Sequence, residues 1–119
     1  MLGSLTVLEL STNNLTSTIP TSLGNLSNLT ILYLHINQLS GSIPQELGML
    51  SSLTKLDLSI NSLTGTIPTS LGNLTELMSL SLISNKLSGS IPFEMNNLTH
   101  LKNFQLSYNQ FTGHLPKNV

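Results

Sequence analysis

The sequence predicts a repeat solenoid of the α/β type, in which every coil contributes one strand to a parallel sheet. Three observations predict it: a 24-residue pattern recurs along the chain, leucine fills most of its recurring positions, and one asparagine stands in every copy without insertion or deletion. Self-similarity at a period of about 20–50 residues is the signature of solenoids and related arrays. The asparagines are Asn13, Asn37, Asn61, Asn85 and Asn109.

One domain of five units accounts for the whole pattern, since 119 residues is a usual length for a single domain. The apolar share of 39% is large enough for a core, whereas only 8% of the residues are charged. Ser, Thr, Asn and Gln must therefore form most of the solvated surface. The units span about residues 2–25, 26–49, 50–73, 74–97 and 98–119.

Composition excludes several classes of function. Four lysines, no arginine and a net charge of −1 provide no attraction to phosphate backbones, so nucleic-acid binding is not expected. The absence of cysteine excludes a disulfide framework and thiolate metal sites, and neither a metal nor another cofactor is expected. The N-terminal MLGSLTVLELSTNN lacks the features of a signal peptide, and no apolar run approaches the ~20 residues of a membrane span.

Each unit begins with a short strand. In the third unit, Leu56 and Leu58 lie on either side of Asp57, which is the alternation of a half-buried strand. Stacked coils would place five such strands side by side, about 4.8 Å apart, in a parallel sheet on the concave face. The equivalent pairs are Leu8/Leu10, Leu32/Leu34, Leu80/Leu82 and Phe104/Leu106.

The recurring asparagine follows the strand at a bend. Its side-chain amide carries both donors and an acceptor. A column of five buried asparagines could therefore satisfy backbone groups that are left free where each coil turns inward. This structural role explains the asparagine column without any catalytic role.

The segment after the bend reads LTGTIP at residues 63–68, with copies in the other units. The recurring glycine permits a backbone conformation that a side chain would obstruct, and the proline fixes φ and would end any regular strand. The residues Pro68, Leu71, Leu74 and Leu77 are then spaced by three. This spacing predicts turns or short 3-10 segments on the convex face in place of an α-helix.

These units resemble the plant-type leucine-rich repeat, LxxLxxLxLxxNxLxGxIPxxLGxL, almost position by position. Residues 50–74 read LSSLTKLDLSINSLTGTIPTSLGNL, and the resemblance extends from Leu2 to Pro116. It implies a right-handed superhelix from the ectodomain of a leucine-rich-repeat receptor-like kinase or receptor-like protein, outside the cell or at its surface. It further implies recognition of a peptide or protein ligand, with a co-receptor as a further partner.

The chain departs from the family pattern in three ways. It lacks the cysteine-bearing caps of family ectodomains, it contains neither a membrane span nor a kinase domain, and Asn96 replaces the usual glycine of LGxL. It therefore looks like an uncapped fragment or a truncated relative. Without caps, the apolar end faces, which include Leu2 at one end and Phe104 at the other, are expected to promote end-to-end self-association.

The outward strand positions form the candidate ligand-binding surface, because the resemblance places ligands on the concave face. Aromatic and apolar side chains would act as anchors there, whereas Lys55 and Asp57 are expected to form an ion pair of little energetic value. The alternative is a solvated sheet face whose binding residues lie in repeats outside this chain. The candidate residues are Tyr33, His35, Ile36, Lys55, Asp57, Ile60 and Tyr108.

No catalytic constellation is visible, and the chain is not expected to be an enzyme. His35, His100 and His114 occupy different positions of the repeat, so they should not converge on a metal or a nucleophile. Glu9 and Asp57 share a column but lie two coils apart, about 9–10 Å at strand spacing. Two solvated carboxylates explain them better than an acid–base pair.

Five Asn-x-Ser/Thr sequons are consistent with passage through the secretory pathway. A repeat rich in Asn, Ser and Thr also generates such triplets by composition, which lowers their weight as signals. The sequons begin at the candidate glycosylation sites Asn14, Asn25, Asn28, Asn73 and Asn97.

A second surface supports alternative functions. A Thr/Ser-x-Thr/Ser pattern recurs in four units and would stack into two parallel hydroxyl columns, a flat array that resembles the surfaces of repeat-type antifreeze proteins. Ice binding, as an antifreeze or recrystallisation inhibitor, is therefore one alternative, and inhibition of a secreted cell-wall-degrading enzyme is another. The hydroxyl residues are Thr16, Thr18, Ser40, Ser42, Thr64, Thr66, Ser88 and Ser90.

Overall fold

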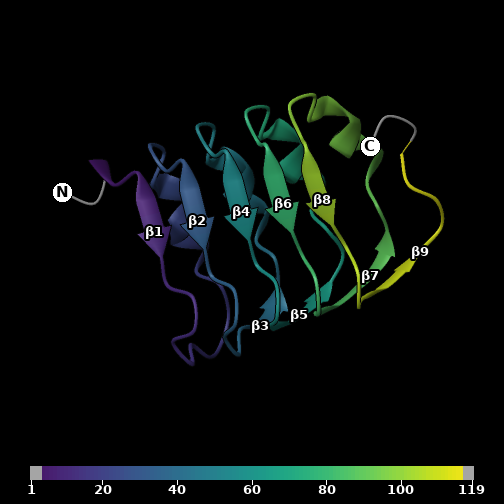
Figure 1. Ribbon diagram of the computed structural model, residues 1–119, viewed down its shortest axis with the longest axis horizontal. Coiled ribbons are helices and arrows are strands. Elements are labelled where there is room, and N and C mark those ends of the chain that lie inside the picture. The colour runs from purple at the N-terminus through teal and green to yellow at the C-terminus, as the bar shows by residue number, and fades with distance from the viewer. Residues whose placement is uncertain (1–3, 117–119) are drawn as a thin grey trace.

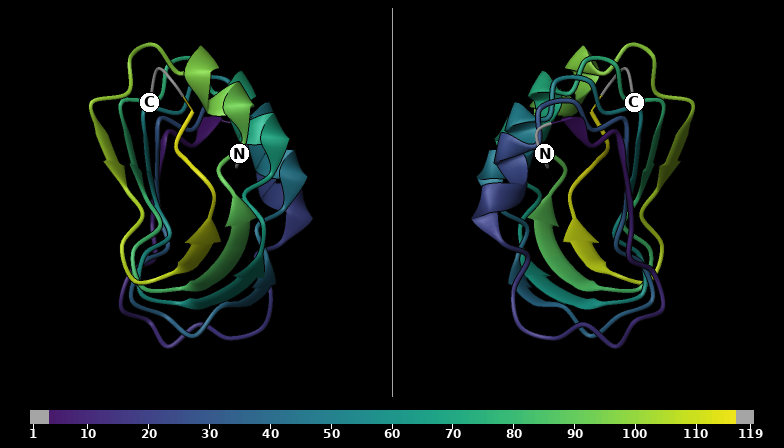
Figure 2. Two further views of the ribbon diagram at one scale, coloured as in Figure 1. Left: turned by 90° about the vertical axis from the view of Figure 1, so that its right-hand side faces the viewer. Right: turned by 90° about the vertical axis from the view of Figure 1, so that its left-hand side faces the viewer.

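The computed structural model describes residues 4–116, and its coils stack side by side along the long axis of the molecule (Figure 1). The principal extents are 42 × 29 × 20 Å. A view along the stack shows three sides, formed by a first sheet, a second sheet and a row of short 3-10 helices (Figure 2). No helix in the described range is long and apolar enough to cross a membrane.

The first sheet confirms the expected row of five parallel strands, in the order β1-β2-β4-β6-β8. Each residue pairs with the residue 24 positions further along, as Leu32 does with Leu56. Both leucines are buried whereas Lys55 is exposed, so the predicted alternation of the strand holds. The strands are β1 (Val7–Glu9), β2 (Ile31–Tyr33), β4 (Lys55–Asp57), β6 (Ser79–Ser81) and β8 (Asn103–Gln105).

The repeat pattern of the sequence does not predict the second sheet. Its four parallel strands are ordered β3-β5-β7-β9 and pair with an offset of 22 residues, so that Ser42 lies opposite Thr64. The inward-facing Leu63 and Leu87 are completely buried. The strands are β3 (Ser40–Ser42), β5 (Ser62–Gly65), β7 (Lys86–Ser90) and β9 (Gln110–Thr112).

Four 3-10 helices form the third side of the coils, as the spacing of three predicts. Each begins after a proline, such as Pro68 with φ −65°, and directs its third residue inward, as with the buried Leu71 of the third unit. The N–H of Leu71 bonds to the carbonyl of Pro68 at 3.1 Å, which is the hydrogen bond of a 3-10 helix. The helices are η2 (Thr21–Asn25), η3 (Gln45–Met49), η4 (Thr69–Asn73) and η5 (Phe93–Asn97).

One continuous apolar core fills the space between the two sheets and the helices. Leu58, Leu63 and Leu71 of the central coils are completely buried. Leu8 and Phe104 pack against the same core but are only half-buried, because a coil covers its apolar layer only with its neighbours.

The asparagine amides fasten each coil to the one before it, which confirms their predicted role. The side-chain oxygen of Asn85 accepts a bond from the N–H of Leu63 at 3.0 Å. Its Nδ2 donates to the carbonyl of Leu58 at 3.0 Å and to that of Leu82 at 3.3 Å. The same arrangement recurs at Asn37, Asn61 and Asn109.

The expectation that all five asparagines are buried is nevertheless wrong. Asn85 is buried, Asn37, Asn61 and Asn109 are half-buried, and Asn13 is exposed. The Nδ2 of Asn13 donates to the carbonyl of Ser11 at 3.0 Å. Among the described residues, Asn13 therefore does not form the bond to a carbonyl 27 positions earlier that the other four amides form.

Candidate functional site

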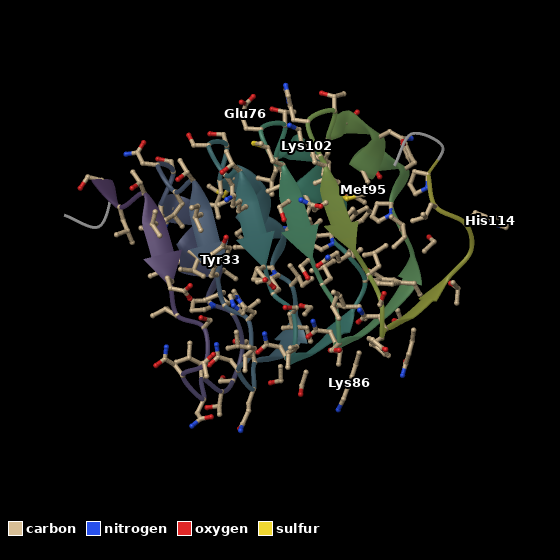
Figure 3. The ribbon with its side chains drawn as sticks, viewed as in Figure 1. Tyr33, Glu76, Lys86, Met95, Lys102 and His114 are labelled. Atoms are coloured by element: carbon tan, nitrogen blue, oxygen red, sulfur yellow. The ribbon has the colours of Figure 1, made fainter. Side chains whose placement is uncertain are left out.

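The outward-facing side chains of the five-stranded sheet, called the sheet face below, include most of the candidate ligand-binding residues. Tyr33, labelled in Figure 3, projects from β2 on this face. The register places one residue of every strand in a central row, as the sequence analysis expects. The row consists of Glu9, Tyr33, Asp57, Ser81 and Gln105.

Four residues at the centre of the sheet face form a compact polar cluster. The rings of Tyr33 and His35 meet edge to face, with centroids 5.4 Å apart and an interplanar angle of 78°. His35 Nδ1 lies 3.6 Å from Asp57 Oδ2. Asp57 Oδ1 accepts bonds from the hydroxyl of Ser59 at 2.6 Å and from its N–H at 2.9 Å. The cluster thus links side chains from two neighbouring coils.

His35 presents a polar atom that lacks a hydrogen bond. Its Nδ1 is buried and has no hydrogen-bond partner among the described residues, because the 3.6 Å to Asp57 exceeds hydrogen-bonding length. Buried polar groups in native proteins nearly always have a partner. Because Nδ1 itself is buried, a ligand on the sheet face would reach only the exposed part of the His35 ring, whose side chain is 23% exposed.

The expected ion pair between Lys55 and Asp57 is not among the interactions of the described residues, and Lys55 is exposed. The Asp57 carboxylate bonds instead to Ser59, two positions further along, and Ser59 is buried. Glu9 forms the same kind of contact, accepting a bond from the N–H of Ser11 at 2.8 Å. Side-chain and backbone hydrogen bonds from Ser11 lower the pKa of Glu9 below its usual value, because they favour the charged form.

The residue directly before each asparagine adopts a positive φ, and these five positions are called the turn row below. Ile36, Ile60 and Tyr108 have φ values of 57°, 55° and 61° and exposed fractions of 42%, 49% and 81%. A left-handed conformation costs an L-residue roughly 1–2 kcal/mol, and a β-branched residue there is an outlier. The sequence carries no glycine or asparagine at these positions that could have revealed the conformation. The row consists of Thr12, Ile36, Ile60, Ser84 and Tyr108.

The two parallel hydroxyl columns expected on the lateral surface are wrong in register. Ser42 lies opposite Thr64, and Thr18 lies opposite Ser40, so that neighbours across the strands come from different columns. An offset of 22 residues between strands, against 24 in the repeat, produces this stagger. The hydroxyls form an oblique array and not two straight columns.

The three histidines do not come together in one site. His35 belongs to the polar cluster, His100 Nδ1 lies 3.0 Å from the carbonyl oxygen of Thr75, and His114 is exposed near the end of the described chain. Within residues 4–116, no three His, Cys, Asp or Glu side chains gather as metal ligands. All five sequon asparagines, Asn14, Asn25, Asn28, Asn73 and Asn97, are exposed.

The chain is similar to solved ectodomains of plant receptor kinases. The leucine-rich-repeat ectodomain of GASSHO1/SCHENGEN3 from Arabidopsis thaliana, in complex with CASPARIAN STRIP INTEGRITY FACTOR 2, is 43% identical with a TM-score of 0.94, over 96% of this chain and 14% of that chain. Arabidopsis HAESA, in complex with the peptide hormone IDA and the co-receptor SERK1, is 39% identical with a TM-score of 0.91, over 95% and 19% of the two chains. The chain thus spans less than a fifth of either ectodomain.

A plant ice-binding protein is similar as well, with 29% identity and a TM-score of 0.81, over 92% of this chain and 43% of that chain. A comparison with curated proteins found no match. The family model described as Leucine rich repeat matches residues 3–63 and 51–111, and these two ranges together include most of the sequence. The chain therefore belongs to the leucine-rich-repeat family.

Proposed function

We propose that the chain is a recognition module of a plant cell-surface receptor-like protein, and that it binds a peptide or protein ligand on the sheet face. The observation that carries the proposal is the turn row, where Ile36 and Ile60 are at once exposed and held at positive φ. Similar ectodomains were solved with a peptide hormone, which supports a ligand of this class. A co-receptor is proposed on the same ground, because HAESA was solved with SERK1.

The fold accounts for the backbone conformation that all five turn-row positions share, but not for isoleucine at two of them. A left-handed backbone at Ile60 raises the free energy of the folded state, and the exposed isoleucine gains little from burial. Asparagine or glycine would satisfy the same backbone geometry at lower cost. A partner that buries Ile36 and Ile60 would supply the stabilisation that the free protein lacks.

The polar cluster gives the proposed ligand its hydrogen-bonding contacts. Tyr33, His35 and Asp57 lie on the sheet face beside the turn row, and the side chain of His35 is 23% exposed. Asp57 is already bound by Ser59, and Lys55 is exposed on the same strand. This part of the sheet face carries few charged side chains, so we expect the affinity for the ligand to depend only weakly on salt.

A phage-displayed library of random linear peptides tests the proposal. Enriched peptides should bind the purified chain, and Tyr33→Ala and Tyr108→Ala should each weaken that binding because aromatic anchors carry much of the interface energy. Thr64→Ala and Thr66→Ala are matched controls on the lateral surface and should leave it unchanged. Failure to enrich any peptide, or loss of binding only in the lateral variants, would overturn the proposal.

Ice binding is the second candidate function, because a plant ice-binding protein shares the fold over most of this chain. The staggered lateral hydroxyls that include Thr64 and Thr66 would be the contact surface. Thermal hysteresis and recrystallisation inhibition of the purified protein provide the test. Activity that Thr64→Tyr and Thr66→Tyr abolish, and that Tyr108→Ala leaves intact, would establish this function in place of the first.

A further inference from the structure

A groove runs along the edge where the second sheet meets the 3-10 helices, and it is called the lateral groove below. Two neighbouring hollows of about 740 Å³ and 540 Å³ share Thr66 in their lining. The first extends across Thr18 and Ser42, and the second reaches Ser90 and Phe93. Together they cross four successive coils, on a different side of the molecule from the sheet face.

The two walls of the lateral groove repeat once per coil. One wall presents a hydroxyl from each coil, and the other presents the first residue of each 3-10 helix. Half-buried Glu46 and Glu94 also line it, and the floor contains the buried Ile43 and Ile67. The hydroxyl wall is Thr18, Ser42, Thr66 and Ser90, and the helix wall is Thr21, Gln45, Thr69 and Phe93.

We propose that the lateral groove binds a neutral linear oligosaccharide, with one pyranose ring per coil. An extended chain of β-1,4-linked pyranoses advances about 5 Å per ring, with successive rings turned by about 180°, and this advance is close to the ~4.7–4.9 Å between neighbouring strands. Each ring would then meet one residue of the hydroxyl wall and one residue of the helix wall. An extended peptide repeats every ~3.3 Å and cannot keep this correspondence over four coils.

The last coil of the groove differs from the others by an aromatic side chain, Phe93, on the helix wall. Its side chain is 74% exposed and borders the second hollow, whereas Thr69 occupies the equivalent place one coil earlier. A flat aromatic ring offers an apolar face on which the C–H face of a pyranose can pack. Phe93 would thus form the stacking platform at one end of the bound oligosaccharide.

The charges in the groove select a neutral ligand. Glu46 and Glu94 are the charged residues among the linings of these two hollows, and neither lining contains a lysine. Carboxylates accept hydrogen bonds from sugar hydroxyls but repel uronates. Strand addition is also disfavoured, because β5 and β7 already pair with strands on both sides, leaving no free strand edge for a peptide.

Calorimetry with cellohexaose, and amide chemical shifts measured by NMR, test the proposal on the unglycosylated chain. Cellohexaose should bind with one-to-one stoichiometry and shift the amides of Thr66 and Phe93, whereas hexagalacturonate should not bind. Phe93→Thr, which copies the preceding coil, should weaken binding about tenfold. Thr66→Val removes one hydroxyl at constant volume and should also weaken it.

Tyr33→Ala separates this site from the sheet face, since it should impair peptide binding and leave cellohexaose binding intact. The absence of any cellohexaose binding overturns the proposal, as does binding that Phe93→Thr and Thr66→Val both leave unchanged. Preferential binding of hexagalacturonate, or competition of the enriched peptides for the groove, would overturn it as well. Far-UV circular dichroism of each variant verifies the fold, so a loss of binding can be assigned to the groove.

Discussion

In each coil, one asparagine amide forms hydrogen bonds with backbone groups that the turn would otherwise leave unpaired. In the fourth unit, Asn85 satisfies the N–H of Leu63 and the carbonyl of Leu58 from the coil before it. These groups lie in the interior, where an unpaired backbone group costs about 1–3 kcal/mol. Replacing this asparagine would therefore cost free energy, because a side chain without its amide leaves these backbone donors and acceptors unsatisfied.

Asn85→Ala is expected to lower the free energy of unfolding by about 2–4 kcal/mol, because at least two buried backbone groups lose their partner. Asn13→Ala is the matched control. Asn13 is exposed, so its replacement should remain within about 0.5 kcal/mol of the parent. Urea denaturation of both variants measures the difference. Equal midpoints would contradict the role assigned to the asparagine amides.

Ile60→Asn is expected to raise the free energy of unfolding by about 1 kcal/mol, since asparagine tolerates the positive φ that a β-branched residue resists. Ile60→Val preserves the branching at Cβ and should leave the stability almost unchanged. Both are compared by urea midpoint. If Ile60→Asn destabilises the protein, the isoleucine is not strained, and the main support for the proposed ligand-binding surface is lost.

At the scale of elements, glycine determines how closely the 3-10 helices stack. A Cβ at Gly72 would lie 2.6 Å from the carbonyl oxygen of Glu94 in the next coil, and one at Gly48 would lie 2.5 Å from that of Ser70. The usual glycine of LGxL is thus required wherever a following coil packs against it. At Asn96, where the chain departs from this pattern, the corresponding neighbour is residue 118, outside the described residues.

Gly72→Ala is expected to destabilise the protein by about 1–3 kcal/mol, because the added methyl group collides with backbone that cannot move aside. The reduced entropy of the unfolded chain would offset roughly 0.4–1 kcal/mol of this cost, so the net effect remains destabilising. Asn73→Ala at the adjacent exposed position is the control. Thermal unfolding followed by circular dichroism decides the outcome, and an increased Tm for Gly72→Ala would disprove the close-packing argument.

At the scale of the whole molecule, stability depends on neighbouring coils and is lowest at the two ends. Leu5 and Leu8 at one end, and Phe104 and Phe111 at the other, are half-buried beside a core whose central leucines are fully covered. Leu2, which the sequence also assigns to the first end face, lies outside the described residues. The outer edges of β1 and β8 have no further strand beside them among the described residues.

The purified 119-residue polypeptide is therefore expected to self-associate end to end as its concentration rises, because association covers apolar surface and pairs strand edges. Sedimentation velocity over a range of concentrations measures this behaviour. Phe104→Lys places a charge on one end face and should reduce association, while Lys102→Ala at a nearby exposed position should not. A monodisperse monomer at the highest concentration would refute the expectation.

The sequence by itself determined the period, the five-stranded sheet and the 3-10 helices. The period-2 alternation around Asp57 and the spacing of three after Pro68 are local patterns, and stacking equivalent coils leaves one register for the first sheet. The hydrogen-bonding role of the asparagines could be predicted too, because an amide that recurs in every unit must act on a backbone feature that all units share. The composition of the sheet face followed from the same periodicity.

Only the tertiary structure decided the features that depend on how neighbouring coils are displaced. The offset of 22 residues in the second sheet, the contact of His35 with Asp57, and the lateral groove beside Thr66 all arise between coils. A 24-residue repeat aligns equivalent residues in sequence but does not specify the stagger of a strand that follows a turn. The positive φ of the turn row was hidden for a related reason. The backbone of this turn bonds to the next coil, as the N–H of Ile60 does to the carbonyl of Ile83 at 2.7 Å, in a conformation that isoleucine does not prefer locally.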